Sequence, residues 1–186
     1  MEDSSQQITN SSSPKLVLYS FWQSSCAWRI RFALNLKVFG RKVSSKGIIA
    51  RRSSAKSSEY AVDDQYLISQ AASIVSSSIQ PLHMVSVLKV VEEKVGPEEP
   101  LLWAQSSIEK GFAALEKLLK DVASRYATGE AVYMADVFLA PQIAVAMMRF
   151  KLDMSKFPTL GRIYESCKAL PEFIAALPQS QPDAVH

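Results

Sequence analysis

The sequence predicts an α+β chain in which a short strand–loop–helix unit is followed by an all-helical bundle domain. The first observation is an apolar run of strand length, residues 16–22, which stands directly before small hydroxyl residues that open a helical repeat. The second is that apolar side chains recur at three- and four-residue steps, the helical period, from residue 65 to residue 178. With 186 residues, 48% of them hydrophobic, the chain is long and apolar enough to bury a core.

Composition limits the classes of partner. A formal net charge of +3 is too small to indicate a polyanionic partner. The two cysteines, Cys26 and Cys167, have no regular spacing, which argues against a disulfide framework or a metal site and favours a reducing compartment. No run approaches the roughly 20 apolar residues that span a bilayer. Residues 1–13 are rich in Ser, Gln and Asn and predict a disordered tail, not a signal or transit peptide. We therefore expect a cytoplasmic protein with no membrane partner.

The N-terminal unit is short and interrupted. We expect a strand over residues 14–21 and a helix over residues 26–37, within a domain that spans residues 14–64. Residues 38–60 are rich in Ser and hold six Lys or Arg residues against one acid, which is typical of an irregular, solvated loop. The alternative for residues 41–56, a nucleic-acid-binding patch, has no support from interleaved aromatic side chains.

The helical domain, residues 65–178, is expected to contain five helices, at about residues 64–95, 101–125, 134–149, 158–170 and 171–177. Pro81 predicts a kink in the first of them, because a proline inside a helix removes a backbone hydrogen bond. Pro158 and Pro171 suit the first turns of the last two helices, where no backbone N–H is needed. Residues 179–186 are expected to form a loose tail.

Ser24, Ser25 and Cys26 are the candidate catalytic residues. They lie at the predicted N-terminus of the first helix, where the helix dipole and free backbone N–H groups bind anions and favour the thiolate form of a thiol. Two other interpretations stay open. The serines are also typical helix N-caps, and a free cysteine is often a small buried residue.

Three larger side chains follow in the same helix. Arg29 lies about one turn further on, where it could pair with a carboxylate. Arg31 is expected to point to solvent, and Trp28 is expected in the core or at an interface.

The stretch Tyr19-Ser20-Phe21-Trp22-Gln23-Ser24-Ser25-Cys26, followed by Trp28-Arg29-Ile30-Arg31, resembles the start of a zeta-class glutathione transferase. That family includes maleylacetoacetate isomerase. Segments of the helical half are similar to the same class, namely residues 70–82, 103–105, 111–116, 135–142, 149–150, 157–160 and 181–183. The resemblance implies a glutathione-transferase-like fold, in which a thioredoxin-like domain precedes an all-helical domain.

The N-terminal half departs from the family pattern. A thioredoxin-like domain of four strands and three helices needs roughly 75–80 residues, whereas 51 lie between Pro14 and Asp64 inclusive. A second strand, the segment with the cis-proline, its hairpin and the following Glu/Gln-Ser pair are not recognisable in the sequence. We therefore expect an incomplete thioredoxin-like domain. An internal deletion, with the basic stretch read from another frame or a retained intron, is the hypothesis that transcript sequencing tests.

The resemblance implies a function and a site. The implied activity is glutathione-dependent cis–trans isomerisation or transfer on maleylacetoacetate and small haloacids, in tyrosine and phenylalanine catabolism, by a homodimer. Glutathione is the implied cofactor and a small electrophilic acid the implied substrate, with Ser24 as the partner of the glutathione thiolate. Arg149 is implied to bind substrate carboxylates, although a cation at a helix C-terminus is an equal interpretation. The implied glutathione-binding residues are Ser24, Ser25, Cys26, Ala27, Trp28, Arg29, Gln80 and Ser86.

Some positions differ from the family. Met84 and Val85 stand where the family has Asn-Leu, and His83 stands where it has Gln. A single histidine on a helix is more often a surface or packing residue than a catalyst. Asp136 is expected to cap its helix as a folding residue, without a full capping box because Tyr133 replaces the family's Ser or Thr.

A second hypothesis is a catalytically impaired, splice-type variant, a helical dimerisation module that no longer binds glutathione. It follows from the missing segment, because each lost polar contact costs about 0.5–1.5 kcal/mol of binding free energy.

Overall fold

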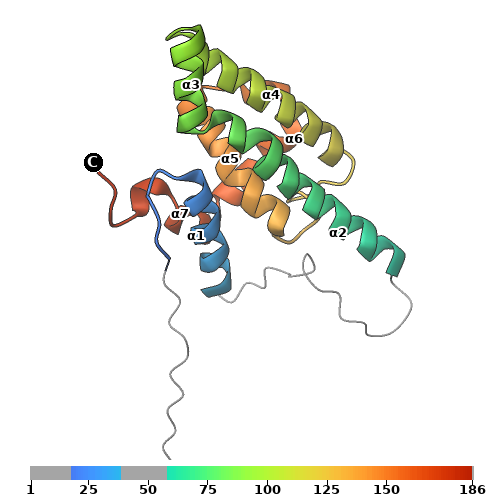
Figure 1. Cartoon of the computed structure of the whole chain (residues 1–186). Coiled ribbons are helices and arrows are strands. Elements are labelled where there is room, and N and C mark those ends of the chain that lie inside the picture. Colours follow the sequence, from blue (N-terminus) through green and yellow to red (C-terminus); the bar gives the residue numbers. More distant parts are fainter. Residues whose placement is uncertain (1–17, 39–57, 186) are drawn as a thin grey trace, which may run out of the picture.

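The computed structural model describes residues 18–38 and 58–185, with the backbone alone for residues 38 and 58–64. The predicted tail and most of the predicted basic segment lie outside these ranges. In chain order the elements are α1 (Ser25–Val38), α2 (Ser58–Ser73), the π-helix η1 (Ile74–Ile79), the 3₁₀-helix η2 (Gln80–His83), α3 (Val85–Val95), α4 (Glu99–Leu119), α5 (Met134–Phe150), η3 (Met154–Lys156), α6 (Pro158–Lys168), α7 (Pro171–Ala175) and η4 (Pro178–Ser180) (Figure 1).

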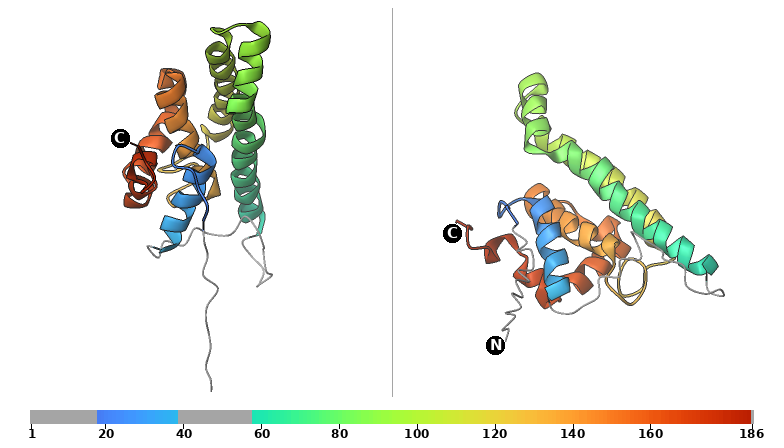
Figure 2. Two further views of the ribbon diagram at one scale, coloured as in Figure 1. Left: turned by 60° about the vertical axis from the view of Figure 1, so that its left-hand side comes forward. Right: turned by 60° about the horizontal axis from the view of Figure 1, so that its bottom comes forward.

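α5 lies at the centre of the molecule, where it contacts α1, α2, α4 and α6. Its side chains are buried on nearly all sides, as its almost wholly apolar sequence predicts for a helix inside a bundle. The segment α2–η1–η2–α3 runs antiparallel to α4 as a long hairpin beside the group formed by α1, α5, α6 and α7 (Figure 2). The expected helical domain is therefore present, and α1 packs onto it.

The predicted strand is absent from the part of its range that the structure describes. Residues 18–21 form no strand, and the side chain of Tyr19 is 93% exposed. A strand needs a neighbour to satisfy its backbone groups. Within the described ranges the only β-bridge is an isolated pair, Tyr126 and Gly129, far along the chain. An apolar run alone therefore misled the prediction here.

The kink expected at Pro81 is confirmed. The backbone N–H of Gln80 donates to the carbonyl of Val75, five residues back, so the helix passes through a π turn into a 3₁₀ turn that holds Pro81 in its first positions. The helix axes of residues 65–83 and Val85–Val95 meet at 43°. No single helix in the described ranges is long and apolar enough to cross a membrane, although these two limbs meet that criterion as a pair.

Two segments differ from the prediction. α4 stops at Leu119, not at residue 125, because the next residues tighten into a turn in which Val122 N–H donates to the Leu119 carbonyl. Arg162 of α6 then donates to the carbonyl of Ala123 at 3.2 Å and holds that turn. The expected loose tail also contains structure, since η4 forms there and Asp183 accepts a hydrogen bond from the backbone N–H of Trp22 at 3.1 Å.

Asp136 is a folding residue, as predicted. Its buried carboxylate accepts hydrogen bonds from the backbone N–H groups of Ala127 at 2.8 Å and Tyr133 at 2.9 Å. The side chain of Tyr133 makes no capping hydrogen bond, so only half of a capping box is present. Burial raises the pKa of Asp136 to about 6, against the effect of these backbone donors.

Candidate active site

The loop before α1 delivers the serine pair and the cysteine to the first turn of that helix. The hydroxyl oxygen of Ser24 accepts a hydrogen bond from the backbone N–H of Ala27 at 3.3 Å, which is the geometry of an N-cap. The capping interpretation left open by the sequence therefore holds for Ser24. A hydroxyl that accepts with its oxygen still has its own hydrogen to donate, so the cap and a thiolate contact are compatible. Ser25 is half-buried and Cys26 is exposed.

Arg29 is the buried cation of the site. Its guanidinium donates to the side-chain oxygen of Gln80 from Nη1 and to that of Gln142 from Nη2, the latter at 3.0 Å. The same group lies over the ring of Phe138, 5.3 Å from its centroid. Burial lowers the pKa of Arg29 to about 10, an effect that the nearby Cys26 partly opposes. At neutral pH the guanidinium therefore stays charged, and two amides take the place of a carboxylate partner.

Gln80 connects this cation to the cysteine. Its side-chain oxygen accepts from Arg29, and its side-chain N–H donates to the sulfur of Cys26. Gln80 opens the 3₁₀-helix η2, directly after the π turn, and from there its side chain reaches the first turn of α1. Cys26, Arg29 and Gln80, which the resemblance named from distant parts of the chain, are thus brought together.

Gln142 was not predicted as a site residue. It lies fully buried in α5 and accepts from Arg29, while its side-chain nitrogen lies 3.0 Å from Nε2 of His83. The available signal was a single amide in an apolar stretch of α5, because buried polar groups are nearly always hydrogen-bonded, but that signal does not name the partner.

His83 is a buried packing residue, one of the two alternatives that the sequence left. Its ring packs against Phe150 with centroids 5.2 Å apart. Burial lowers the pKa of His83, hydrogen bonds to Gln142 and to the backbone oppose that shift, and the charges of Arg149 and Arg29 add to it. Histidine is therefore neutral here at physiological pH.

The other predicted residues occupy different places. Arg149 is exposed in the last turn of α5 with its guanidinium 5.2 Å from the ring centroid of Phe150. Ser86 is exposed in the first turn of α3, beyond the bend. The side chains of Ala27 and Trp28 are buried in the core, where Trp28 packs on Phe173 at 5.1 Å between centroids. Any contact from Ala27 or Trp28 to a ligand would therefore come from the backbone.

The prediction that Arg31 points to solvent is wrong. α7 packs on this side of α1, so Arg31 is buried at the seam and donates to the Ala176 carbonyl at 3.3 Å. It also donates to the Ser20 hydroxyl at 3.3 Å and to the Trp22 carbonyl at 3.1 Å. Burial lowers the pKa of Arg31, and Asp183 opposes that shift. Arg31 thereby fastens the loop that carries the serine pair to the C-terminal segment.

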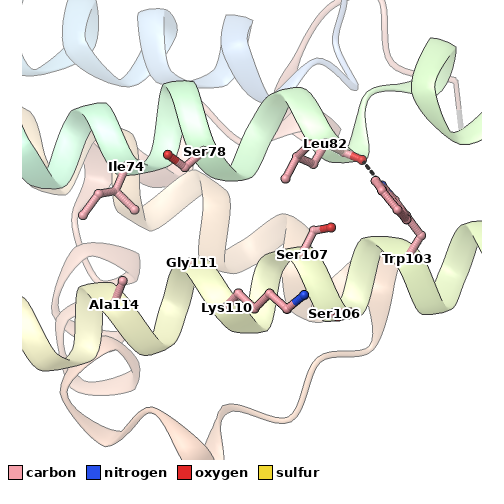
Figure 3. Close-up of a pocket in the computed structure, with 9 residues that line it drawn as sticks. All are labelled: Ile74, Ser78, Leu82, Trp103, Ser106, Ser107, Lys110, Gly111 and Ala114. Atoms are coloured by element: carbon pink, nitrogen blue, oxygen red, sulfur yellow. Dashed lines mark hydrogen bonds between the residues drawn. The ribbon is translucent and has the colours of Figure 1, made fainter.

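A separate pocket of about 470 Å³ lies between η1–η2 and α4, on the side away from α1 (Figure 3). The indole N–H of Trp103 donates to the Leu82 carbonyl at one end of it, at 2.9 Å. None of the predicted site residues lines it, so it is distinct from the Cys26 cluster. In the part of the chain that the structure describes, no group of three or more His, Cys, Asp or Glu side chains could hold a metal ion. The lining residues are Ile74, Ser78, Leu82, Trp103, Ser106, Ser107, Lys110, Gly111 and Ala114.

Comparison with known proteins gives consistent matches along the chain. No family model matches it. It is 41% identical to a zeta-class glutathione S-transferase of Euphorbia esula, over 92% of this chain and 93% of that protein. It is 33% identical to the maleylacetoacetate isomerase of Rattus norvegicus, over 91% and 95% of the two chains. Among solved structures, the maleylacetoacetate isomerase of Anaeromyxobacter dehalogenans 2CP-1 with glutathione in its active site matches with a TM-score of 0.72 and 31% identity, over 90% of this chain and 96% of that one.

The helical domain with α1 packed on it is thus the helical part of a glutathione-transferase-like fold, whose N-terminal domain is incomplete in the described ranges. The chain belongs to the zeta-class glutathione transferases, an enzyme family whose members include maleylacetoacetate isomerases. The aligned span with the Euphorbia protein, 210 residues, is longer than the 186 residues of this chain, so the relative carries residues that have no counterpart here.

Proposed function

We propose that this chain is a glutathione-dependent cis–trans isomerase and transferase that acts on maleylacetoacetate and on small haloacids. The observation that carries the proposal is the meeting of the Ser24–Cys26 turn with Gln80 and Arg29 at the N-terminus of α1. The glutathione bound in the active site of the Anaeromyxobacter enzyme supports it.

The residues present fit the sulfur end of glutathione. A thiol with an ordinary pKa of about 8.5 is only a few per cent ionised at neutral pH, so the site must favour the anion. The first-turn N–H groups of α1 have no partner within the helix and carry its positive dipole end. The Ser24 hydroxyl hydrogen is free to donate toward the same place, and the buried charge of Arg29 lies behind Gln80. These groups would hold the thiolate beside Cys26.

When bound, glutathione supplies the thiolate that adds to the cis double bond and leaves after rotation, which gives the trans isomer. The chain would contribute orientation and charge to that reaction. We propose that the exposed guanidinium of Arg149 takes a carboxylate of the acid, as a forked donor of fixed geometry. In this proposal the enzyme acts as a cytoplasmic homodimer in tyrosine and phenylalanine catabolism, and two free cysteines suit a reducing compartment.

A second candidate function is a helical dimerisation module that has lost glutathione binding. Two observations favour it. The described ranges contain no strand of the sheet that the family uses to bind the peptide backbone, and the relatives carry residues with no counterpart here.

Turnover of maleylacetoacetate with glutathione, followed by absorbance, tests the first candidate. Replacing Ser24 should lower kcat/KM by about 10- to 100-fold, because a hydrogen bond to a charged group is worth about 1.5–3 kcal/mol. Ser24→Ala also removes a helix cap, whereas Ser24→Gly keeps most of the capping stability, so both variants should lose the same activity.

The matched control is Ser166→Ala, since that half-buried hydroxyl donates to the Arg162 carbonyl within α6, away from the Cys26 cluster. Full activity of Ser24→Gly would mean that Ser24 is a cap and nothing more. Absence of turnover in the folded wild-type protein would favour the second candidate.

A further inference from the structure

A continuous line of hydrogen bonds joins Cys26 to His83. It runs from the Cys26 sulfur through Gln80, Arg29 and Gln142 to the imidazole. Its members come from α1, the bend between α2 and α3, and α5, and each of the four bonds joins residues that are more than 50 positions apart in the sequence. Family resemblance assigns no role to His83, because the family has Gln at that place.

The direction of each bond follows from Arg29. A guanidinium can only donate, so both amide oxygens must face it. The Gln142 side-chain nitrogen then faces the imidazole, with 3.0 Å between it and Nε2 of His83, while the Gln142 oxygen is 3.3 Å from the same atom. An amide N–H needs a lone pair to donate to. The shorter of the two contacts thus corresponds to a neutral His83 with its proton on Nδ1.

We propose that neutral His83 is a positioning residue for this site: by accepting from Gln142 it holds that amide, and through it Arg29 and Gln80, in register with the Cys26 sulfur. Protonation of His83 would place an N–H opposite the Gln142 N–H, so the imidazole would have to donate instead to the Gln142 oxygen, which lies 3.3 Å from Nε2 and already accepts from Arg29. The imidazolium would then compete with Arg29 for the Gln142 oxygen, and in this proposal the shift of Arg29 disturbs the alignment of Gln80 on the sulfur.

The surroundings of His83 oppose its protonation. The charged groups that act on it are Arg29 from α1 and Arg149 from α5, both cationic. α3 and α4, which also pack against η2, bring no charge that shifts it among the described residues. The ring is 4% exposed, so water cannot screen an added charge well. The acid form is therefore reached only below the ordinary histidine range, and it is a strained form.

The effect on Cys26 has a definite sign. An N–H that donates to sulfur favours the thiolate, so losing the Gln80 alignment should make the thiol less reactive. A purely electrostatic influence of an imidazolium would act the other way, because a positive charge favours a thiolate. The direction of the change therefore separates positioning from simple charge.

Alkylation of Cys26 by iodoacetamide between pH 7.5 and pH 4 tests the proposal, with the scan carried down until the ¹⁵N shift of His83 shows that the ring is protonated. Cys167 is fully buried, so Cys26 is the reactive thiol. The rate for an uncoupled thiol falls about tenfold per pH unit, since only the thiolate reacts. In the wild type the fall should become steeper than this as His83 titrates. In His83→Gln, where an amide replaces the imidazole and cannot titrate, it should stay near tenfold per unit.

The matched control is His186→Gln at the other histidine of the chain, which should keep the steeper wild-type profile. Equal slopes in the wild type and His83→Gln would overturn the proposal. A shallower slope in the wild type would also overturn it, because it would show that the imidazolium acts by its charge.

Two further measurements keep the test independent of folding defects. Cys26 in His83→Leu should react about two- to tenfold more slowly than in the wild type at pH 7.5, and in His83→Gln most of that loss should be recovered. If the His83 side chain served only to fill space, the two variants would react at the same rate. The ¹⁵N shift of His83 Nε2 in the wild type should be that of an unprotonated ring nitrogen at pH 7, and a protonated Nε2 would contradict the bond directions. None of these measurements uses glutathione. The proposal concerns the same site as the proposed function, yet either can fail alone.

Discussion

Arg29 determines the geometry of its surroundings because a buried cation must find acceptors. Arg29 orients the side-chain oxygens of Gln80 and Gln142 toward itself. The side-chain nitrogen of Gln80 then faces Cys26, and that of Gln142 faces His83. Cys26, Arg29 and Gln80 could be named from the sequence by resemblance. Gln142 could not, because a buried glutamine shows that it has a partner but not which one.

Arg31 shows the opposite limit of sequence-based reasoning. Two residues after Arg29, it lies on another side of the same helix, and nothing local indicates that α7 covers that side. The contact that buries Arg31 joins it to a carbonyl 145 residues away. A helical pattern predicts which residues share a face, but not which distant segment covers that face.

Asp136 gives a pH-dependent prediction at the same scale. Its pKa is raised from 3.8 to about 6 on folding, so between those values the folded state binds more protons than the unfolded state. Its contribution to the free energy of unfolding is therefore largest at low pH and is lost as pH rises through about 6. Two pKa units correspond to about 3 kcal/mol at most. Urea unfolding should thus show a larger advantage of the wild type over Asp136→Asn at pH 5 than at pH 7.5.

The control is Asp153→Asn, at an exposed carboxylate whose pKa is lowered by Ser155. Its stabilising contribution should be present at neutral pH and lost as pH falls, the reverse order. The opposite result would be a stability advantage of the wild type over Asp136→Asn that grows from pH 5 to pH 7.5. It would show that the Asp136 carboxylate is ionised in the folded protein, and that its hydrogen bonds to backbone N–H groups lower its pKa more than burial raises it.

At the scale of elements, local chemistry predicted the bend but not the helix ends. Pro81 lacks an N–H, and this fact is independent of tertiary structure, so the kink could be inferred from the sequence. The end of α4 at Leu119 depends instead on Arg162, which reaches back from α6 to hold the following turn. The apolar sequence continues past that point, so periodicity alone extends the helix too far.

The close approach of α4 to η1 is testable with a pair of glycines. A Cβ added at Gly111 would overlap the side chain of Ile79, which is fully buried. Overpacking costs about 1–3 kcal/mol, more than the roughly 1 kcal/mol that alanine gains over glycine in a helix. Gly111→Ala should therefore lower the melting temperature.

Gly161 in α6 is the matched site, because a Cβ there would meet nothing within 4 Å. Gly161→Ala should raise stability by about 0.5–1 kcal/mol. A stabilised Gly111→Ala would show that Ile79 can move aside and that the α4–η1 contact does not depend on glycine.

At the scale of the whole molecule, the helical domain and α1 were predictable from the sequence, and the strand expected before α1 was wrong where the structure describes it. Each helix of the domain has its own apolar stripe, and the stripes jointly define a core around α5. A strand carries no such independent signal, since its backbone needs a partner strand, and none is present in the described ranges. The Cys26 cluster was therefore predictable in large part, because its residues all belong to α1 and the helical domain.

That asymmetry makes glutathione affinity the decisive property of the molecule. If the α1 turn and the helical domain suffice, isothermal titration calorimetry should show one glutathione per chain with a Kd below about 1 mM, weakened by Gln80→Ala and unchanged by Gln179→Ala at an exposed position. No heat of binding from a protein whose circular dichroism shows intact helices would contradict the account and leave a helical module without a glutathione site.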